Sequence, residues 1–393
     1  MVIARFGCVK NYVAGLAWMG ALLAATHRSE SPVILGRYSW SYAYLLGSLV
    51  SIAAMLSLAK STWLVKLCHA RAGLVMSGVS LLLAICLTEV GVRAADLYGI
   101  SYYELVGDYM RNMQADEHLI YRHKPSWEQR IGDVLVIYNE RGLRDRPILP
   151  KADGEYRILA LGDSATFGWG VPQNQIFPFR LEQLLQSRLQ RPVRVINSGV
   201  GGYNTVQELT YFKREGVELQ PDLVMLTYVE NDIEENKGPF KPKTGFSLRG
   251  LSLPGIVVEI SRKLWLYRLA DHTYHYALHK QMEGESSKLF QGGQGWSDSM
   301  SALDELIATC EANNIALIVF YFRWEPDEEN PLFRDVVRHA NGAPVKDMGQ
   351  WFKGLDKFSL TISRVDSHAN AEAHRVMAEH MAVDIVNYLV ARK

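Results

Sequence analysis

The first quarter of the chain contains three long stretches without a charged side chain. They cover residues 11–26, 38–59 and 72–88, and the third continues apolar past Glu89 to Val92. A helix that crosses a bilayer core needs about 20 mostly apolar residues, with a range of about 17–25. The pattern therefore predicts an N-terminal α-helical transmembrane region over residues 1–95, with helices at 11–26, 38–59 and 72–92.

The first of these stretches is the shortest, and it also fits a signal peptide. Arg5 and Lys10 give it a charged start, and Ala-x-Ala-like sites occur near Ala24 and Ala25. Two further apolar stretches follow it directly. This arrangement favours a retained multi-pass anchor over a cleaved leader.

Positively charged residues are distributed unevenly around the apolar stretches. Arg5 and Lys10 precede the first stretch, and Lys60, Lys66 and Arg71 lie between the second and the third. Segments rich in Lys and Arg stay in the cytoplasm. Three spans then predict an inner (plasma) membrane protein whose C-terminal domain is periplasmic or extracellular. Two spans would reverse that orientation.

Beyond the apolar quarter, residues 96–153 are polar and aromatic and are expected to form a juxtamembrane connector. Short apolar runs then alternate with stretches of helical spacing, which predicts a parallel sheet covered on both faces. The expected domain covers residues 154–393, with an insertion at 237–296 of the length of a lid or substrate-shaping element. Strands are expected at 157–161, 193–196, 223–228, 315–320 and 345–348, and helices at 177–189, 206–215, 300–312 and 371–390.

Charge and cysteine content narrow the possible functions. The chain has 42 Lys and Arg against 42 Asp and Glu, but residues 1–95 carry a balance of +6 and the remainder −6. No basic tract follows residue 95, so nucleic acid is not an expected partner. The four cysteines form no C-x-x-C motif and no Cys/His spacing typical of a metal site.

Polar motifs follow the ends of three expected strands, and a fourth precedes the last helix. They are Gly-Asp-Ser at 162–164, Gly-Val-Gly-Gly at 199–202, Glu-Asn-Asp at 230–232 and Asp-Ser-His at 366–368. Ligands of an open parallel sheet bind beyond the carboxyl ends of its strands. A serine there can attack a carbonyl, a histidine held by a carboxylate can take its proton, and N–H groups can stabilise the oxyanion. Each motif alone also fits an ordinary turn or helix cap.

Taken together, these four motifs resemble the SGNH or GDSL hydrolase superfamily. The resemblance runs from about Arg157 to the C-terminus, interrupted by the insertion. It implies a flavodoxin-like three-layer α/β/α fold, an activity on acyl groups and no metal or organic cofactor. It also implies Ser164 as the nucleophile and His368 as the base, with Ser164, Gly202 and Asn231 forming the oxyanion hole.

Asp366 is the expected orienting carboxylate, although its spacing departs from that of many members. They place the aspartate three residues before the histidine, whereas Asp366 stands two before His368. His374, six residues further on, is expected to be a packed or surface residue of the last helix. The extended motif at 161–171 and the upstream sequence at 138–145 resemble exported and membrane-anchored bacterial members.

The sequence therefore predicts a membrane-anchored serine esterase that hydrolyses acyl esters, expected to be O-acetyl esters, of an envelope glycan or lipid. Its expected partners are an ester-bearing small molecule, lipid or glycan and the lipid bilayer. Two alternatives stay open. One is an acyltransferase that moves an acyl group onto a cell-envelope polysaccharide, and the other is a catalytically inactive glycan-binding or scaffold protein. The intact set of serine, glycine, asparagine and histidine argues against the second.

Overall fold

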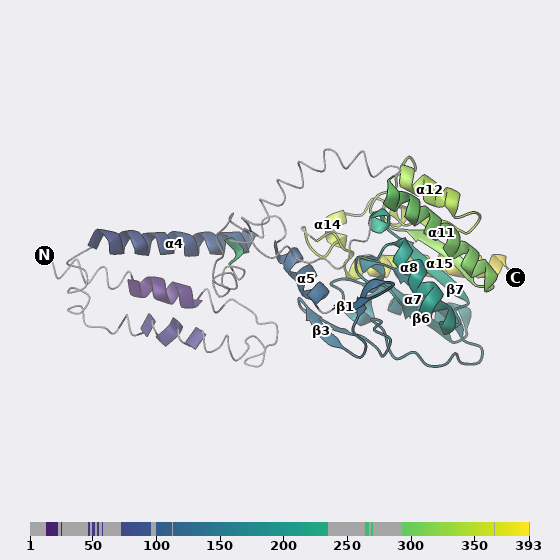
Figure 1. The fold of residues 1–393 in the computed structure, drawn as a ribbon, viewed down its shortest axis with the longest axis horizontal. Helices are drawn as coiled ribbons and strands as arrows, with labels where there is room; N and C mark the ends of the chain where they lie inside the picture. The colour runs from purple at the N-terminus through teal and green to yellow at the C-terminus, as the bar shows by residue number, and fades with distance from the viewer. Residues whose placement is uncertain are drawn as a thin grey trace. The chain divides into compact units, whose positions relative to one another are not determined.

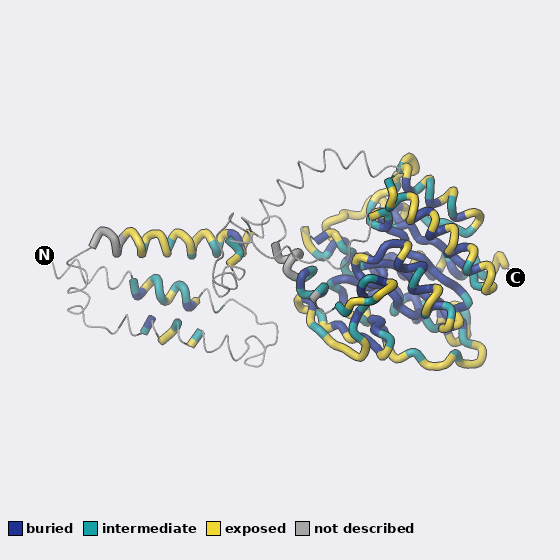
Figure 2. Tube along the Cα trace, in the orientation of Figure 1, coloured by how far each residue is buried: buried dark blue, intermediate teal, exposed yellow. Residues whose placement is uncertain are grey.

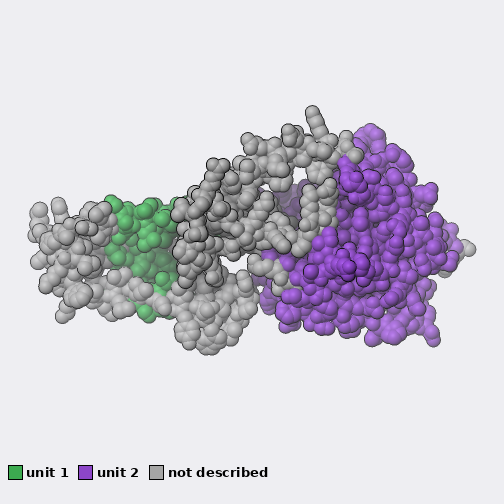
Figure 3. All heavy atoms as spheres, in the orientation of Figure 1, with its two compact units in different colours: residues 1–100, 245–274 green, residues 101–244, 275–393 purple. Residues whose placement is uncertain are grey.

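The chain forms two compact units, which are described separately. The first comprises Met1–Ile100 with Gly245–Tyr274, and the second Ser101–Thr244 with His275–Lys393 (Figure 3). The expected insertion at 237–296 and the expected span at 38–59 lie mostly outside the described residues. The computed structural model describes residues 13–22, 25, 46–47, 49–51, 53–54, 57, 72–95, 100–111, 113–234, 264–266, 269, 293–364 and 366–392.

In the first unit, helix α4 (Ala72–Ala95) covers the third expected span. Within the described residues, its part Ser77–Ala95 is long and apolar enough to cross a membrane, judged by length and composition. Most of its residues from Ser77 onward are exposed (Figure 2), and Leu81 is 64% exposed. The helix Val13–Leu22, in the first expected span, is apolar but shorter. The three-span anchor stays a prediction.

Near the end of α4, Glu89 binds a short piece of the 245–274 segment. Its carboxylate accepts hydrogen bonds from the backbone N–H groups of Trp265 (2.9 Å) and Leu266 (2.8 Å), and it pairs with Arg93 at 2.8 Å. The Arg93 guanidinium also lies 5.7 Å from the centroid of the Trp265 ring. A carboxylate and a cation–π contact therefore join the two segments of this unit.

The second unit is built on a five-stranded parallel sheet with the strand order β6-β5-β7-β8-β9. Figure 1 labels two of its strands, β6 and β7. Each strand agrees with its expected counterpart to within one residue at either end. Every residue of β5 and β7 is buried, as is usual for parallel strands covered on both faces. The strands are β5 (Tyr156–Gly162), β6 (Val193–Asn197), β7 (Leu223–Tyr228), β8 (Ala316–Tyr321) and β9 (Val345–Asp347).

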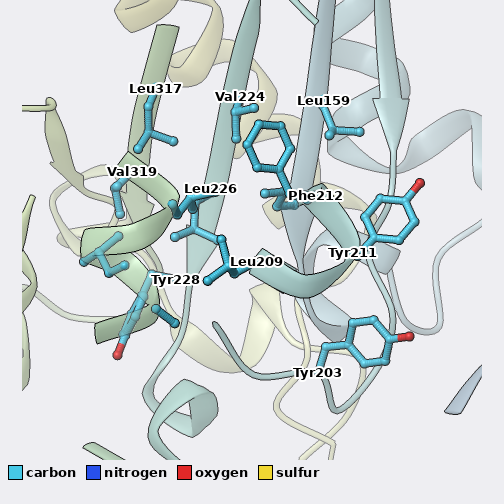
Figure 4. Packing of buried hydrophobic residues seen from close by; sticks show 14 of the residues in the cluster. Leu159, Tyr203, Leu209, Tyr211, Phe212, Val224, Leu226, Tyr228, Leu317 and Val319 are labelled. Atoms are coloured by element: carbon cyan, nitrogen blue, oxygen red, sulfur yellow. The ribbon is translucent and has the colours of Figure 1, made fainter. Parts of the chain in front are cut away.

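Helices cover both faces of this sheet. Alternate side chains of each strand point to opposite faces. On one face, Leu159, Val224 and Leu226 belong to the hydrophobic cluster of Figure 4, which includes residues of α8 (Thr205–Tyr211), α11 (Gln294–Ala312) and α12 (Pro331–His339). On the other face, Ile158 and Met225 pack in a second cluster with α7 (Phe177–Leu189) and α15 (Ala371–Ala391). The expected three-layer α/β/α fold is confirmed for this part of the chain.

Residues 101–153 carry more secondary structure than their sequence indicates. They contain most of α5 (Ile100–Arg111) and two antiparallel hairpins, and they belong to the same compact unit as the sheet. All four hairpin strands are short, so their alternation of polar and apolar residues gives a weak signal. The hairpins pair β1 (Met113–Asp116) with β2 (Ile120–His123), and β3 (Glu128–Ile131) with β4 (Val134–Ile137).

Arg144 ties this segment to the loop after β5. Its side chain is fully buried, and its guanidinium donates to the carbonyl oxygens of Phe167 (3.0 Å), Gly168 (2.5 Å) and Val171 (2.5 Å). Burial lowers the pKa of Arg144 to about 10, so the group stays protonated at neutral pH. Three carbonyl oxygens of one loop therefore share a single buried cation.

The turn after β6 packs directly on the backbone of α6 (Ser164–Phe167). A Cβ atom added at Gly199 would lie 2.3 Å from the amide nitrogen of Phe167, so no side chain fits there. The backbone N–H of Val200 donates to the carbonyl oxygen of Gly162 at 3.1 Å. These contacts fix the loops that leave β5 and β6 against each other.

Gly199→Ala should lower the free energy of unfolding by about 3 kcal/mol, because the new methyl group overlaps backbone that cannot move aside. Gly154→Ala is the control. Its φ is +74°, so alanine is strained there by about 1 kcal/mol, but nothing lies within 4 Å of the added Cβ. Thermal unfolding of the full-length protein in detergent measures both. Equal losses in the two variants would show that the close contact is absent.

Candidate active site

Ser164 stands at the carboxyl end of β5, as the first residue of α6. Asp163 caps this helix, since its Oδ1 accepts the N–H of Ala165 at 2.9 Å. Gly168 ends the helix in the left-handed region at φ 82°, and its N–H donates to the carbonyl of Ser164. The strand end and the two caps together place a half-buried serine at the sheet edge where ligands bind.

The structure brings Ser164, His368 and Asp366 into one hydrogen-bonded row. The Nε2 of His368 lies 2.8 Å from the Oγ of Ser164, and its Nδ1 lies 2.7 Å from the Oδ1 of Asp366. Asp366 Oδ1 also accepts the backbone N–H of His368 at 3.1 Å. The two-residue spacing between Asp366 and His368 therefore permits the contact in which the aspartate orients the histidine.

The partners of His368 fix its tautomer. An ionised carboxylate only accepts hydrogen bonds, so Nδ1 carries a proton and donates to Asp366. In the neutral ring Nε2 is then an acceptor, and it can receive the hydroxyl proton of Ser164. Asp163 Oδ2 is a second acceptor for that proton, at 3.1 Å from Ser164 Oγ. The shorter contact, at 2.8 Å, is the one to the imidazole.

Trp169 is a member of this arrangement that sequence reasoning missed. Its indole N–H donates to the Oδ2 of Asp366 at 2.9 Å, and its ring lies 5.6 Å from that of His368, centroid to centroid. Burial opposes ionisation of Asp366, but the hydrogen bonds and charge of His368, with the Trp169 bond, hold the pKa of Asp366 below its usual value. The carboxylate is therefore ionised at neutral pH.

Asn231 reaches the same place from the loop after β7. Its Nδ2 donates to the Oδ2 of Asp163 at 3.1 Å, and Asp163 is also the neighbour of Ser164. Gly202, on the turn after β6, is exposed and adopts a φ of 80°. An exposed backbone N–H can point at a ligand. Among the described residues, no hydrogen bond joins Gly202 to Ser164 or Asn231, so Gly202 is connected to the site through the backbone of its loop.

Two carboxyl groups lie buried close to these loops. Burial, together with the negative charge of Asp163, raises the pKa of Asp232 well above its usual value. Burial and the charges of Asp232 and Asp163 do the same for Glu208. Within the part of the chain that is described, neither carboxylate oxygen of Glu208 has a hydrogen-bond partner. Burial and the acidic surroundings therefore favour the neutral forms of both groups.

His374 is not part of the site. It is buried in α15, where its Nδ1 accepts the backbone N–H of Phe177 at 3.1 Å and its ring stacks on the Phe177 ring at 5.7 Å. This agrees with the expectation of a packed helix histidine. Across the described ranges, no group of three or more His, Cys, Asp or Glu residues is arranged to hold a metal ion.

A serine, a histidine and an aspartate in this order at the edge of a parallel α/β sheet form the arrangement that serine hydrolases use. The family model described as the GDSL-like Lipase/Acylhydrolase family matches residues 160–376, and the chain belongs to this family. It is accordingly a hydrolase of ester bonds. No curated protein sequence matches the chain.

Several solved structures are similar to part of the chain. A catalytic mutant of Axe2, an acetylxylan esterase from Geobacillus stearothermophilus, is 16% identical, with 58% of this chain and 94% of that chain covered and a TM-score of 0.38. The psychrotrophic esterase EstA from Pseudoalteromonas sp. is 15% identical, with 59% and 98% covered and a TM-score of 0.37. The lipase Lip_vut3 from a goat rumen metagenome is 15% identical, with 58% and 96% covered and a TM-score of 0.36.

The buried histidine predicts a pH dependence of stability. Burial, with smaller contributions from the charges of Arg144 and Arg180, lowers the pKa of His374 to about 3. At this position the unfolded chain therefore binds a proton below about pH 6.5 that the folded chain does not, and the contribution of His374 to the free energy of unfolding falls by about 1.4 kcal/mol per pH unit below that point. His374→Gln keeps an acceptor for the Phe177 N–H but cannot titrate.

Between pH 6.5 and 4.5, the His374→Gln protein should lose about 2 kcal/mol less stability than the wild type. Urea unfolding of the full-length protein in detergent at several pH values measures the difference. His380→Gln, at an exposed position of the same helix, is the control and should follow the wild type. Identical pH profiles for all three proteins would mean that His374 is protonated in the folded state.

Proposed function

We propose that the chain is a serine esterase in which Ser164 is the nucleophile, His368 the general base and Asp366 the orienting carboxylate. The observation that carries the proposal is the position of His368. One of its ring nitrogens lies 2.8 Å from Ser164 Oγ and the other 2.7 Å from Asp366 Oδ1. A general base needs the first contact for proton transfer and the second for its tautomer, and His368 makes both.

In the acylation step, Ser164 Oγ attacks the ester carbonyl carbon while His368 Nε2 takes the hydroxyl proton. The negative charge that develops on the carbonyl oxygen is stabilised by the backbone N–H groups of Ser164 and Gly202 and by the amide of Asn231. His368 then gives its proton to the departing alcohol, and the acyl group remains on Ser164. Asp366 stabilises the imidazolium while it exists.

In the deacylation step, a water molecule replaces the alcohol. His368 takes a proton from this water as it attacks the acyl-enzyme carbonyl, and the same N–H groups hold the second oxyanion. Collapse of the intermediate releases the carboxylic acid and returns the proton to Ser164. A sugar hydroxyl in place of this water would give an acyltransferase, so the choice between the two depends on what reaches the acyl-enzyme.

Ser164→Ala should reduce kcat on para-nitrophenyl acetate by at least about 10³-fold, and His368→Ala should be equally severe, because nucleophile and base act as a unit. A fluorophosphonate probe should label the wild type but not the Ser164→Ala protein. Ser187→Ala and His380→Ala, at exposed positions outside the site, are the matched controls and should retain wild-type turnover. Full labelling of the Ser164→Ala protein would place the nucleophile at another residue.

We further propose that the enzyme is anchored in the inner membrane with its catalytic domain on the periplasmic or outer side. The Lys/Arg bias of the N-terminal quarter and the exposed apolar helix α4 support this placement. An outward-facing anchored esterase meets envelope material, so O-acetyl or other acyl esters of an envelope glycan or lipid are its proposed substrates. This substrate class follows from the proposed location alone.

Alkaline phosphatase fused after Lys393 should be active in bacterial cells, because that enzyme matures only outside the cytoplasm. A reporter that works only in the cytoplasm should be silent at the same point. Three spans with a cytoplasmic N-terminus require this result. The opposite pattern would mean that residues 11–26 do not span the membrane.

A further inference from the structure

The loop that carries Gly202 is held by residues that precede the region matched by the family model. Gly201 has both of its backbone polar groups bonded to tyrosines of the 101–153 segment. Its N–H donates to the hydroxyl oxygen of Tyr109, on α5, at 2.7 Å. Its carbonyl oxygen accepts from the hydroxyl of Tyr121, on β2, at 3.2 Å. Two side chains from one segment therefore fix the orientation of a single glycine.

The bond from Tyr121 acts on the oxyanion donor through one peptide group. The carbonyl of Gly201 and the N–H of Gly202 belong to the same planar unit and point in opposite directions when the peptide is trans. A hydroxyl that holds the carbonyl therefore also sets the direction of the N–H. It also polarises the peptide group, which makes the N–H a stronger donor.

The bond from Tyr109 belongs to a chain of hydrogen bonds with a single direction. His123 Nδ1 lies 3.0 Å from the carbonyl oxygen of Gly142, so this nitrogen carries the proton. Burial lowers the pKa of His123 to about 3, and the ring is neutral at physiological pH. Its Nε2 must then accept the hydroxyl proton of Tyr109 at 2.7 Å, which leaves the Tyr109 oxygen to accept from Gly201.

Packing also holds this peptide in place. Tyr109 and Tyr121 are each 2% exposed. A Cβ atom added at Gly201 would lie 3.0 Å from the Tyr109 ring, and one added at Gly202 would lie 2.8 Å from the Tyr121 hydroxyl. Gly202 also needs its positive φ of 80°, which an L side chain rarely adopts. The tyrosines therefore fill the space directly behind the exposed turn.

We propose that Tyr121 and Tyr109 are positioning residues of the oxyanion hole, which aim the N–H of Gly202 by holding the peptide group and the N–H of Gly201. This inference rests on the proposed esterase function. The segment before the sheet then contributes to the site, because α5 and β2 orient the loop that carries Gly202. Both tyrosines are buried and act through the backbone of Gly201.

Tyr121→Phe removes one buried hydroxyl and tests the proposal. We expect kcat on para-nitrophenyl acetate to fall about 10-fold with KM within about twofold, since full loss of an oxyanion donor costs about 10²–10³-fold and here the donor is only misdirected. Inhibition by an alkyl trifluoromethyl ketone, whose tetrahedral adduct places an oxyanion in the hole, should weaken by the same factor. Titration to completion with a fluorophosphonate counts active sites, so rates are expressed per folded enzyme.

Tyr138→Phe is the matched control. Tyr138 is a buried tyrosine of the same segment, 3% exposed, and its hydroxyl accepts from the Gln129 side chain at 2.8 Å. The Tyr138→Phe protein should keep its kcat and its inhibition constant for the ketone within about twofold of the wild type, because the loss of this side-chain contact does not redirect the oxyanion donor. Equal kinetics per active site for Tyr121→Phe and Tyr138→Phe would overturn the proposal, as would a change confined to KM.

Tyr109→Phe provides a second, independent test, which is needed if Tyr121→Phe does not fold. Tyr109→Phe removes the hydroxyl on the N–H side of Gly201, and it should lower kcat with KM unchanged. Unchanged kcat per active site in this variant would also contradict the proposal. A wild-type protein that neither hydrolyses the ester nor takes up the fluorophosphonate contradicts the proposed function itself, and the inference falls with it. The wild-type assay therefore separates the two failures.

Discussion

A single imidazole joins two parts of the chain that lie 204 residues apart. His368 contacts Ser164 at the end of the first strand of the sheet and Asp366 just before the last helix. For both contacts to form, the strand end and the final loop must be placed to within a few tenths of an ångström. The sheet provides the first position, because β5 is buried along its whole length and paired on both sides.

The loop that carries His368 is fixed by its own short contacts. The N–H of Ile362 donates to the carbonyl of His368 at 2.9 Å, and Thr361 forms a bridge with Ala369. Asn370 then caps α15 with its side-chain oxygen, and its amide nitrogen donates back to the carbonyl of Thr361 at 3.1 Å. A loop held at both ends loses little further entropy when its histidine is aligned, so the alignment is present before substrate arrives.

Much of the fold and of the candidate site could be predicted from the sequence, because these parts depend on local sequence patterns. Buried parallel strands give continuous apolar runs, which is why 223–228 is the observed range of β7. Motifs that follow such strands must meet at one edge of the sheet, which is why Ser164 and Asn231 are found near a common partner, Asp163. The final helix begins at a recognisable asparagine cap, Asn370, and His368 lies just before it.

The contacts that sequence reasoning missed have partners far along the chain. Trp169 donates to Asp366, 197 residues away, and Tyr121 donates to the backbone of Gly201, 80 residues away. The sequence alone does not distinguish a tryptophan or tyrosine that only packs in a core from one that donates a hydrogen bond to a distant acceptor. The hairpins before the sheet were missed for another reason, since four-residue strands such as β1 offer too few positions for a period to be counted.

Asp163 shows how the site can keep a carboxylate beside its nucleophile. Its Oδ1 is occupied by the N–H of Ala165, and its Oδ2 accepts from the amide of Asn231. A side-chain amide has two N–H groups. The bond to Asp163 uses one of them and fixes the plane of the amide, so the direction of the second is set before charge develops on a substrate. A donor that is already oriented loses no energy to reorganisation when the oxyanion forms, which is the condition under which such donors contribute most. Tyr121 and Asp163 would then each orient one oxyanion donor. Tyr121 orients the N–H of Gly202 through a backbone peptide, and Asp163 orients the side-chain amide of Asn231.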